Sequence, residues 1–307
     1  MCIMYDVVII GSGPAGLTAG IYGKRAGLKT LIVDKSPVAG GQITSTYEID
    51  NYPGLPKLSG AELGAKFQEH AKQLEVEFAV ASVTEIEDKK DVKVLHTNKD
   101  DIETKTVIIA TGATHRHLGV PGENELTGMG VSYCATCDGA FFRNKDVAVV
   151  GGGDVALEDA LFLARTSAKV YLIHRRDAFR GAKILEDQVR STENIELVLD
   201  SVVDEVVGDG MVESVSVSNK KTGEKSSIKV NGVFMAVGII PNTDGLNGLP
   251  EVNEGGYIVA GEDGVTSISG VFAAGDVRTK GLRQVITACS DGANCITSVS
   301  HFIENSK

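Results

Sequence analysis

Hydrophobic residues form short runs along this chain, and the runs recur in the same order in two stretches. In the first stretch, apolar runs at 5–10 and 29–33 flank a glycine-rich turn and a segment of helical periodicity at 14–25. This pattern predicts a strand, a helix and a second strand. The second stretch repeats the order, with strand, helix and strand at 146–150, 155–165 and 169–173. We therefore expect two similar α/β units.

Each unit continues with another helix, near 61–74 or near 183–192. Apolar and polar residues then alternate over 76–109 and 195–230, which predicts a β-meander in each unit. The predicted fold class is α/β. It consists of two similar Rossmann-like nucleotide-binding domains, each with three layers formed from a parallel sheet and a β-meander.

The segment from Gly270 onward has no counterpart at the end of the second unit, so we expect it to return to the first unit. The second domain would then be an insertion in the first. The predicted boundaries give a discontinuous domain, 1–117 and 245–307, and an inserted domain, 118–244. His115 and His117 flank the first crossing and are expected on the surface.

The composition is that of a soluble protein without an affinity for polyanions. Among 307 residues there are 30 basic and 41 acidic side chains, a net charge of −11, which argues against nucleic acid or an anionic membrane as a partner. The N-terminus has no signal-peptide pattern, and no apolar stretch approaches the about 18 residues of a membrane-spanning helix. We expect a cytoplasmic protein.

The first glycine-rich turn has the spacing of a dinucleotide-binding motif. It follows a strand, precedes a helix and is followed by Asp34 at the end of the next strand. The glycines let the backbone approach a pyrophosphate, and a carboxylate at that strand end hydrogen-bonds a ribose. Asp34 could alternatively be an ordinary turn residue at a strand end. The residues of the turn are Gly11, Ser12, Gly13, Pro14, Ala15 and Gly16.

The second turn has the same spacing but a basic ending. Arginines in place of the acidic residue accommodate a ribose 2′-phosphate, which predicts NADP rather than NAD. The alternative is a solvated basic face. The turn contains Gly151, Gly153, Asp154 and Ala156, and the basic ending contains His174, Arg175, Arg176 and Arg180.

Cys134 and Cys137 form the one closely spaced pair among the five cysteines. A structural zinc site needs four ligands, and the sequence offers no second C-x-x-C, so neither zinc nor an inert buried pair is favoured over a redox disulfide. No metal is expected. Asp138 follows the pair directly and could exchange a proton with it, or could be a turn residue before a glycine. Three cysteines remain, of which Cys2 is terminal and Cys289 and Cys295 fall in a predicted helix that packs on the core.

Taken together, these motifs resemble the low-molecular-weight thioredoxin reductases over essentially the whole chain. The C-A-T-C-D-G element at 134–139 is the most specific match. The resemblance implies FAD in the first domain and NADPH in the inserted one. It also implies that Asp138 is the acid for the dithiol. The further residues it implies around FAD are Lys35, Gly41, Gln42, Asn51, Ala110, Thr111, Gly112, Gly275, Asp276, Arg283 and Gln284.

The implied activity is reduction of thioredoxin. NADPH reduces FAD, FADH2 reduces the Cys134–Cys137 disulfide, and the dithiol reduces oxidised thioredoxin, with rotation of the inserted domain between steps. A homodimer is also expected from the resemblance. Two alternatives remain open: a flavin-only diaphorase or ferredoxin–NADP reductase, and a flavin-binding redox sensor with a zinc knuckle. The sequence does not indicate which cysteine attacks thioredoxin.

Overall fold

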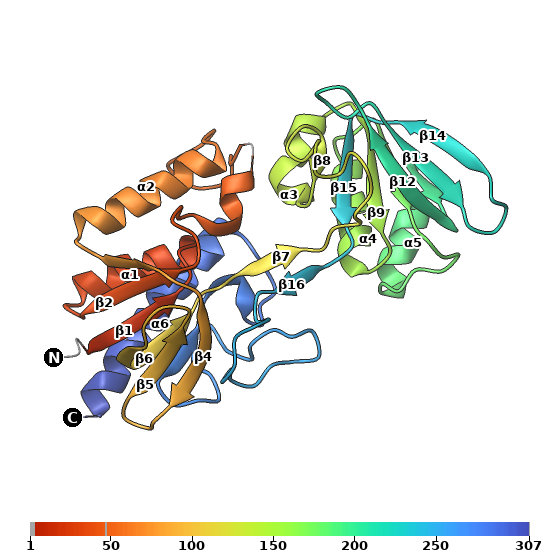
Figure 1. The fold of residues 1–307 in the computed structure, drawn as a ribbon. Helices are drawn as coiled ribbons and strands as arrows, with labels where there is room; N and C mark the ends of the chain where they lie inside the picture. The colour runs from red at the N-terminus through yellow and green to blue at the C-terminus, as the bar shows by residue number, and fades with distance from the viewer. Residues whose placement is uncertain (1–3, 47, 307) are drawn as a thin grey trace. The chain divides into compact units, whose positions relative to one another are not determined.

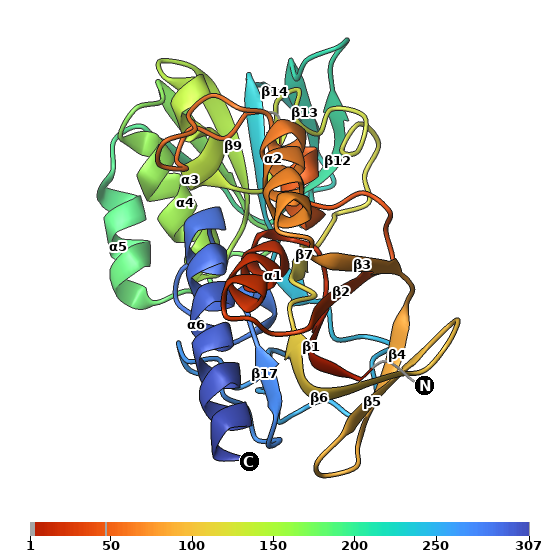
Figure 2. The same ribbon diagram turned by 90° about the vertical axis from the view of Figure 1, so that its left-hand side faces the viewer.

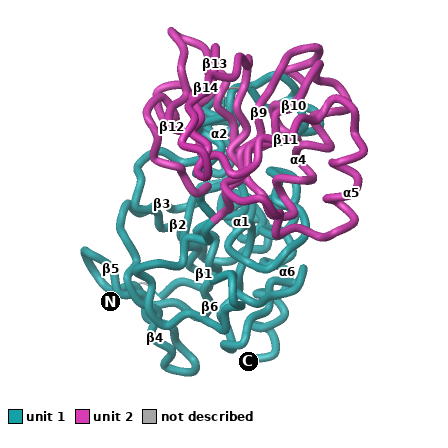
Figure 3. Tube along the Cα trace, turned by 90° about the vertical axis from the view of Figure 1, so that its right-hand side faces the viewer, with its two compact units in different colours: residues 1–114, 240–307 teal, residues 115–239 magenta. Residues whose placement is uncertain are grey.

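A computed structural model describes residues 4–46 and 48–306. The chain divides into two compact units, Met1–Thr114 with Ile240–Lys307 and His115–Ile239 (Figure 3). These divisions fall three and five residues before the predicted boundaries at 117/118 and 244/245. They lie within a two-stranded ribbon formed by β7 (Ala113–His115) and β16 (Ile239–Pro241), so both crossings run through paired strands.

The sheet of unit 1 has the strand order β3-β2-β1-β6-β5-β4, and β17 also pairs with β6 (Figure 2; Figure 1 shows β1, β2, β4, β5 and β6 of the same sheet). The pairs among β1, β2, β3, β6 and β17 are parallel, whereas β4 and β5 are antiparallel additions. The strands are β1 (Tyr5–Ile10), β2 (Thr30–Asp34), β3 (Glu77–Val80), β4 (Val83–Asp88), β5 (Lys93–Thr97), β6 (Ile102–Ile109) and β17 (Val271–Ala273).

The helices of unit 1 cover one face of this sheet. A buried cluster joins α1, α6 and the sheet, and α1 and α6 lie side by side (Figure 2). Ser59 begins α2 with a capping box, because its hydroxyl accepts from Glu62 N and the Glu62 carboxylate accepts from Ser59 N. The helices are α1 (Pro14–Arg25), α2 (Gly60–Gln73), α6 (Val285–Asn305) and the 3-10 helices η1 (Gly41–Ser45) and η3 (Gly275–Val277).

Unit 2 has a five-stranded parallel sheet in the order β11-β10-β9-β15-β8. Its helices pack on one face of the sheet, and a separate antiparallel sheet, β12-β13-β14, packs on the other. The strands are β8 (Val131–Ser132), β9 (Asp146–Gly151), β10 (Lys169–Ile173), β11 (Ile195–Val198), β12 (Ser201–Val207), β13 (Ser214–Asn219), β14 (Lys225–Lys229) and β15 (Gly232–Ala236). The helices are α3 (Ala135–Asp138), η2 (Gly139–Phe142), α4 (Asp154–Ala164) and α5 (Lys183–Ser191).

The predicted fold class is confirmed, including the return of the C-terminal segment through β17. The predicted meanders are wrong at their first strands. β3 and β11 each pair in parallel with the preceding strand, β2 and β10, because a helix or a long connection separates them in sequence. Among the described residues, no helix is both long enough and apolar enough to cross a membrane.

Candidate functional site: two glycine turns and a disulfide

The first glycine of each turn packs against the carbonyl that ends a returning strand. A Cβ on Gly11 would lie 2.4 Å from Ala110 O, and a Cβ on Gly151 would lie 2.3 Å from Ala236 O. Gly11 also has a φ of +108°, which side chains rarely adopt. The backbone of each turn therefore packs tightly against the end of a neighbouring strand. The N-termini of α1 and α4 follow the turns directly, which is the arrangement that binds a pyrophosphate.

Asp34 lies at the end of β2 and is hydrogen-bonded to the first turn. Its Oδ2 accepts from the backbone N and the Oγ of Ser12 at 2.6 and 2.7 Å, and its Oδ1 accepts from Ser36 N at 2.8 Å. Gly40 N donates to Ser12 O at 2.8 Å, which brings the loop before Gly41 and Gln42 onto the turn. Since a carboxylate oxygen has more than one acceptor position, Asp34 can also receive a ribose hydroxyl.

Three of the residues predicted to contact FAD each have a buried polar atom without a hydrogen-bond partner. Thr111 Oγ1, Asp276 Oδ1 and Arg283 Nε are buried without a hydrogen-bond partner, and only one other side-chain atom in the described residues shares this property. An unsatisfied buried polar atom is costly, so such atoms fit a polar ligand. Burial raises the pKa of Asp276, while the charges of Lys280 and Arg283 oppose that rise. The residues present therefore fit FAD.

Other predicted residues of this set lie nearby in unit 1. Asn51 Nδ2 donates to Gln284 Oε1 at 2.9 Å, although 233 positions separate them in sequence. The guanidinium of Arg283 lies 4.2 Å from the ring centroid of Tyr257. Lys35, by contrast, has an exposed side chain.

A buried ionic cluster that the sequence analysis missed supports the loop at Asp276. Asp291 of α6 accepts from Gly275 N at 2.9 Å, from two nitrogens of Arg278 at 2.8 and 2.6 Å, and from Lys280 Nζ at 2.9 Å. The three charged side chains are only 5–6% exposed. This cluster fixes the loop to α6. Nothing in the local pattern around Asp291 indicated its partners.

The two remaining cysteines that are described lie in the core. Cys289 and Cys295 are buried in α6, as predicted, and burial raises the pKa of both thiols. Cys2 lies outside the described residues.

In unit 2, His174 lies beneath the second turn. A Cβ on Gly152 would lie 2.2 Å from the His174 ring, and His174 Nε2 lies 3.2 Å from Ala178 O. Burial lowers the pKa of His174. Arg180 N donates to Gly152 O at 2.7 Å, so the basic loop is tied to the turn. His174 therefore supports the turn from below rather than extending into solvent.

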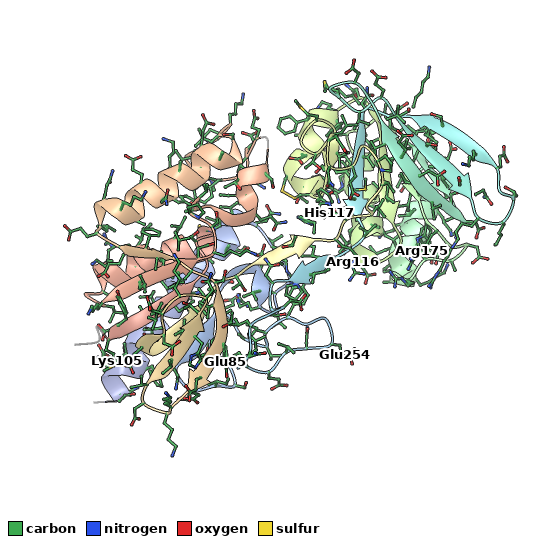
Figure 4. The ribbon with its side chains drawn as sticks, viewed as in Figure 1. Glu85, Lys105, Arg116, His117, Arg175 and Glu254 are labelled. Carbon is green, nitrogen blue, oxygen red and sulfur yellow. A yellow bond between two sulfur atoms is a disulfide. The ribbon has the colours of Figure 1, made fainter. Side chains whose placement is uncertain are left out.

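The predicted arginines follow β10 and are exposed (Figure 4 labels Arg175). Within the described part of the chain, no carboxylate lies within ion-pairing distance of Arg175, Arg176 or Arg180. Their guanidinium groups remain available to a phosphate, which arginine binds in bidentate fashion.

Cys134 and Cys137 are joined by a disulfide in the same unit, with Cys134 directly before α3. Ser132 supports this segment, because its Oγ accepts from Cys134 N at 3.1 Å and donates to Asp138 Oδ2 at 2.6 Å. Burial raises the pKa of Asp138, and the hydrogen bond from Ser132 opposes the rise. A carboxyl group with a raised pKa holds its proton to higher pH than usual, and beside a disulfide it can supply that proton when the bond is reduced.

His115 is less exposed than the sequence analysis expected. Its ring is half-buried and stacks on Tyr133 with centroids 5.2 Å apart, while His117 is exposed and contacts the Tyr133 hydroxyl. Burial, with a smaller effect of the His117 charge, lowers the pKa of His115 to about 4. Its ring packs on Tyr133, which lies beyond the crossing in sequence, so the local sequence around His115 does not reveal this contact.

Comparison with known proteins agrees with this geometry. Residues 5–292 match the pyridine nucleotide-disulphide oxidoreductase family. Thioredoxin reductase of Bacillus subtilis (strain 168) is 43% identical over 98% of this chain and 95% of that protein. Thioredoxin reductase of Listeria innocua is 44% identical over 99% and 95%. The chain belongs to the pyridine nucleotide-disulphide oxidoreductase family and, within it, to the thioredoxin reductases.

Solved structures give the same result. Thioredoxin reductase from Streptococcus pyogenes MGAS5005 has a TM-score of 0.94 at 45% identity, covering 98% of this chain and 99% of that one. Thioredoxin reductase from Lactococcus lactis, described in an FR conformation, has the same identity and coverage but a TM-score of 0.65. The predicted resemblance is confirmed.

Proposed function

We propose that this thioredoxin reductase passes two electrons from NADPH, through FAD and the Cys134–Cys137 disulfide, to oxidised thioredoxin. Membership of the family supports the reaction and both cofactors. One observation carries the residue-level proposal. The disulfide, the half-buried carboxyl group of Asp138 and the second dinucleotide turn occupy one inserted unit, whereas the first turn lies in the other.

In unit 1, we assign FAD to the first turn, Asp34 and the loop at Asp276. Bound FAD would accept a hydride from NADPH and supply two electrons to the disulfide. The turn and the N-terminus of α1 would receive the pyrophosphate, and Asp34 the ribose. The buried polar atoms of Thr111, Asp276 and Arg283 would form hydrogen bonds with the same cofactor.

In unit 2, we assign NADPH to the second turn and its basic loop. The turn at 151–156 would hold the pyrophosphate at the N-terminus of α4, with His174 supporting Gly152 from beneath. Arg175, Arg176 and Arg180 would bind the 2′-phosphate. This assignment makes NADPH the preferred donor over NADH.

The disulfide accepts the electrons within unit 2. Two electrons break the S–S bond and two protons complete the thiols of Cys134 and Cys137, one of them supplied by Asp138. The dithiol then attacks the disulfide of thioredoxin through its thiolate, which restores the Cys134–Cys137 bond and leaves thioredoxin reduced. Which of the two cysteines attacks is left open in this proposal.

The dithiol and the NADPH site share one unit, while a single flavin site lies in the other. Both must reach the same flavin in turn, so we propose that unit 2 rotates on the two crossings between steps. The different TM-scores of two equally similar relatives support such rearrangement in this family. Cross-linking the two units should abolish turnover while FAD remains bound. Full turnover in the cross-linked protein would contradict rotation.

The cellular setting is also part of the proposal. A catalytic C-x-x-C together with two buried cysteines that remain reduced is typical of a reducing compartment, which supports the cytoplasm. The resemblance to thioredoxin reductases supports a homodimer.

The experiment that tests this function measures NADPH oxidation by the purified flavoprotein with and without oxidised thioredoxin, and with NADH for comparison. We expect oxidation that depends on thioredoxin and favours NADPH. Cys137→Ser should retain reduction of the flavin by NADPH and lose reduction of thioredoxin. Flavin reduction in the unsubstituted protein without thioredoxin turnover would contradict the assignment of thioredoxin as the substrate.

A further inference from the structure

Glu123 lies just beyond the first crossing into unit 2 and is fully buried, with 0% of its surface exposed. Its Oε1 accepts from Leu118 N at 3.0 Å and its Oε2 accepts from Gly119 N at 2.7 Å. The carboxylate therefore holds residues 118–123, the segment by which the chain enters unit 2, in a turn. A buried carboxylate persists only where several donors satisfy it, so this geometry is specified rather than incidental.

Tyr133 supplies a third donor to this carboxylate from another part of the chain. Its hydroxyl donates to Glu123 Oε1 at 2.9 Å, and His117 Nδ1 lies 2.8 Å from the Tyr133 hydroxyl oxygen and 3.5 Å from Glu123 Oε1. Because the single phenol proton goes to Glu123, His117 donates to Tyr133 from a protonated Nδ1. The Tyr133 ring also stacks on His115 and meets His117 edge-on. Two interactions of different kinds therefore hold this side chain.

The hydrogen bond from Tyr133 persists across the working pH range. Burial, together with the hydrogen bond to Glu123, raises the pKa of Tyr133, so the phenol keeps its proton. The lowered pKa of His115 leaves the stacked ring neutral.

Tyr133 directly precedes Cys134, the first cysteine of the disulfide. The backbone N of Cys134 is already held by Ser132 Oγ on the side of Asp138. We propose that Tyr133 is a positioning residue whose hydroxyl, held by Glu123 and His117, fixes the dithiol segment to the segment by which the chain enters unit 2. The disulfide then moves with that crossing as one body, and its approach to the electron donor is reproducible.

This inference rests on the proposed function and is tested on the FAD-loaded enzyme with Tyr133→Phe. The substitution keeps the ring and its stacking on His115 but removes the hydroxyl. Tyr171→Phe is the matched control, because Tyr171 also lies in unit 2, on β10, where its ring lies under Lys169 Nζ. Three quantities are measured: the rate of flavin bleaching by NADPH, the rate at which two titratable thiols appear, and the melting temperature.

We expect Tyr133→Phe to slow thiol formation about tenfold, the effect of losing one hydrogen bond to a charged group. Flavin bleaching and the KM for NADPH should be unchanged, so kcat falls alone. Tyr171→Phe should match the unsubstituted enzyme in all three measurements. Unchanged thiol formation in Tyr133→Phe would overturn the proposal, as would an equal slowing of bleaching and thiol formation with a lowered melting temperature.

The outcome is separable from that of the proposed function. Thiol formation after one equivalent of NADPH requires no thioredoxin, so it tests Tyr133 even if another protein is the physiological substrate. An unsubstituted enzyme that forms thiols but does not reduce thioredoxin would contradict the substrate assignment alone.

Discussion

The hydroxyl of Ser132 donates a hydrogen bond of 2.6 Å to Oδ2 of Asp138, across the disulfide-bearing segment. Ser132 is buried and Asp138 is half-buried, and burial raises the pKa of Asp138 while this hydrogen bond opposes the rise. Ser132 therefore stabilises the charged form of the carboxyl group that is proposed to deliver a proton. A serine two residues before the first cysteine sets both the position and the acidity of that group.

Ser132→Ala should shift the pH dependence of disulfide reduction. A general acid acts in its protonated form, so the rate falls as pH rises through the pKa of Asp138. Removing a donor to the carboxylate raises that pKa further, and the alkaline fall should move to higher pH. The measurement is the rate of thiol formation by NADPH against pH. Ser167→Ala, at a buried serine whose hydroxyl has no partner, is the control and should leave the profile in place. An unmoved profile in Ser132→Ala would show that Asp138 is not the acid.

The double substitution Arg175→Ala, Arg176→Ala should weaken NADPH selectively. Each hydrogen bond to a charged group contributes about 1.5–3 kcal/mol, so we expect the KM for NADPH to rise roughly ten- to a hundredfold. The KM for NADH should change little, because that cofactor lacks the 2′-phosphate. Steady-state kinetics with both cofactors measure the difference in KM between NADPH and NADH. Arg190→Ala removes a charge that is paired with Glu186 instead and should leave this difference unchanged. A strong preference for NADPH in the double variant would refute the assignment.

The local chemistry of this chain was predictable, and its long-range pairing was not. The run from Gly11 to Gly16 predicts a turn between strand and helix because glycine spacing and periodicity are local properties. The alternation after residue 76 predicts strands but not their partners, so β3 was assigned to a meander although it pairs in parallel with β2. Alternation fixes the face of a residue, whereas a parallel partner depends on the connection that the intervening helix makes.

The same limit applies to the candidate site. Residues proposed to bind or react fall in recognisable motifs, as Cys134 and Asp34 do. Residues that hold them in place do not, because Asp291 and Glu123 acquire their roles only from donors that the fold brings to them. An isolated acidic residue in a sequence is more often exposed than buried, so neither was distinguishable beforehand.

Asp291→Asn should weaken FAD binding by loosening the loop at Asp276 that the ionic cluster supports. The substitution leaves Arg278 and Lys280 buried without their counter-charge, and breaking a buried ion pair typically costs about 3–5 kcal/mol. We expect a lower melting temperature and a lower content of FAD in the purified protein, with partial recovery when FAD is added. Glu262→Gln, an exposed carboxylate in the same unit, should behave like the unsubstituted protein. Full FAD content and an unchanged melting temperature would show that the cluster does not support the cofactor.

His115→Phe should reduce the loss of folding stability that occurs as pH falls below neutral. The pKa of His115 is about 4 in the folded protein, against an ordinary 6.5, so the unfolded chain binds the additional proton between these values. The stabilisation is therefore present above pH 6.5 and is lost as pH falls toward 4. A difference of about 2.5 units corresponds to about 3 kcal/mol.

The phenylalanine variant keeps a ring against Tyr133 but cannot titrate. Its free energy of unfolding, measured by urea denaturation at pH 7 and pH 4.5, should decline less than that of the unsubstituted protein. Taking the difference between the two proteins removes the contribution of other groups, such as Asp159, whose pKa burial raises to about 7 and whose effect has the opposite sign. The exposed residue His301, changed to phenylalanine, should show the ordinary decline. Equal declines in His115→Phe and the unsubstituted protein would mean that His115 titrates normally and is not buried against Tyr133 in solution.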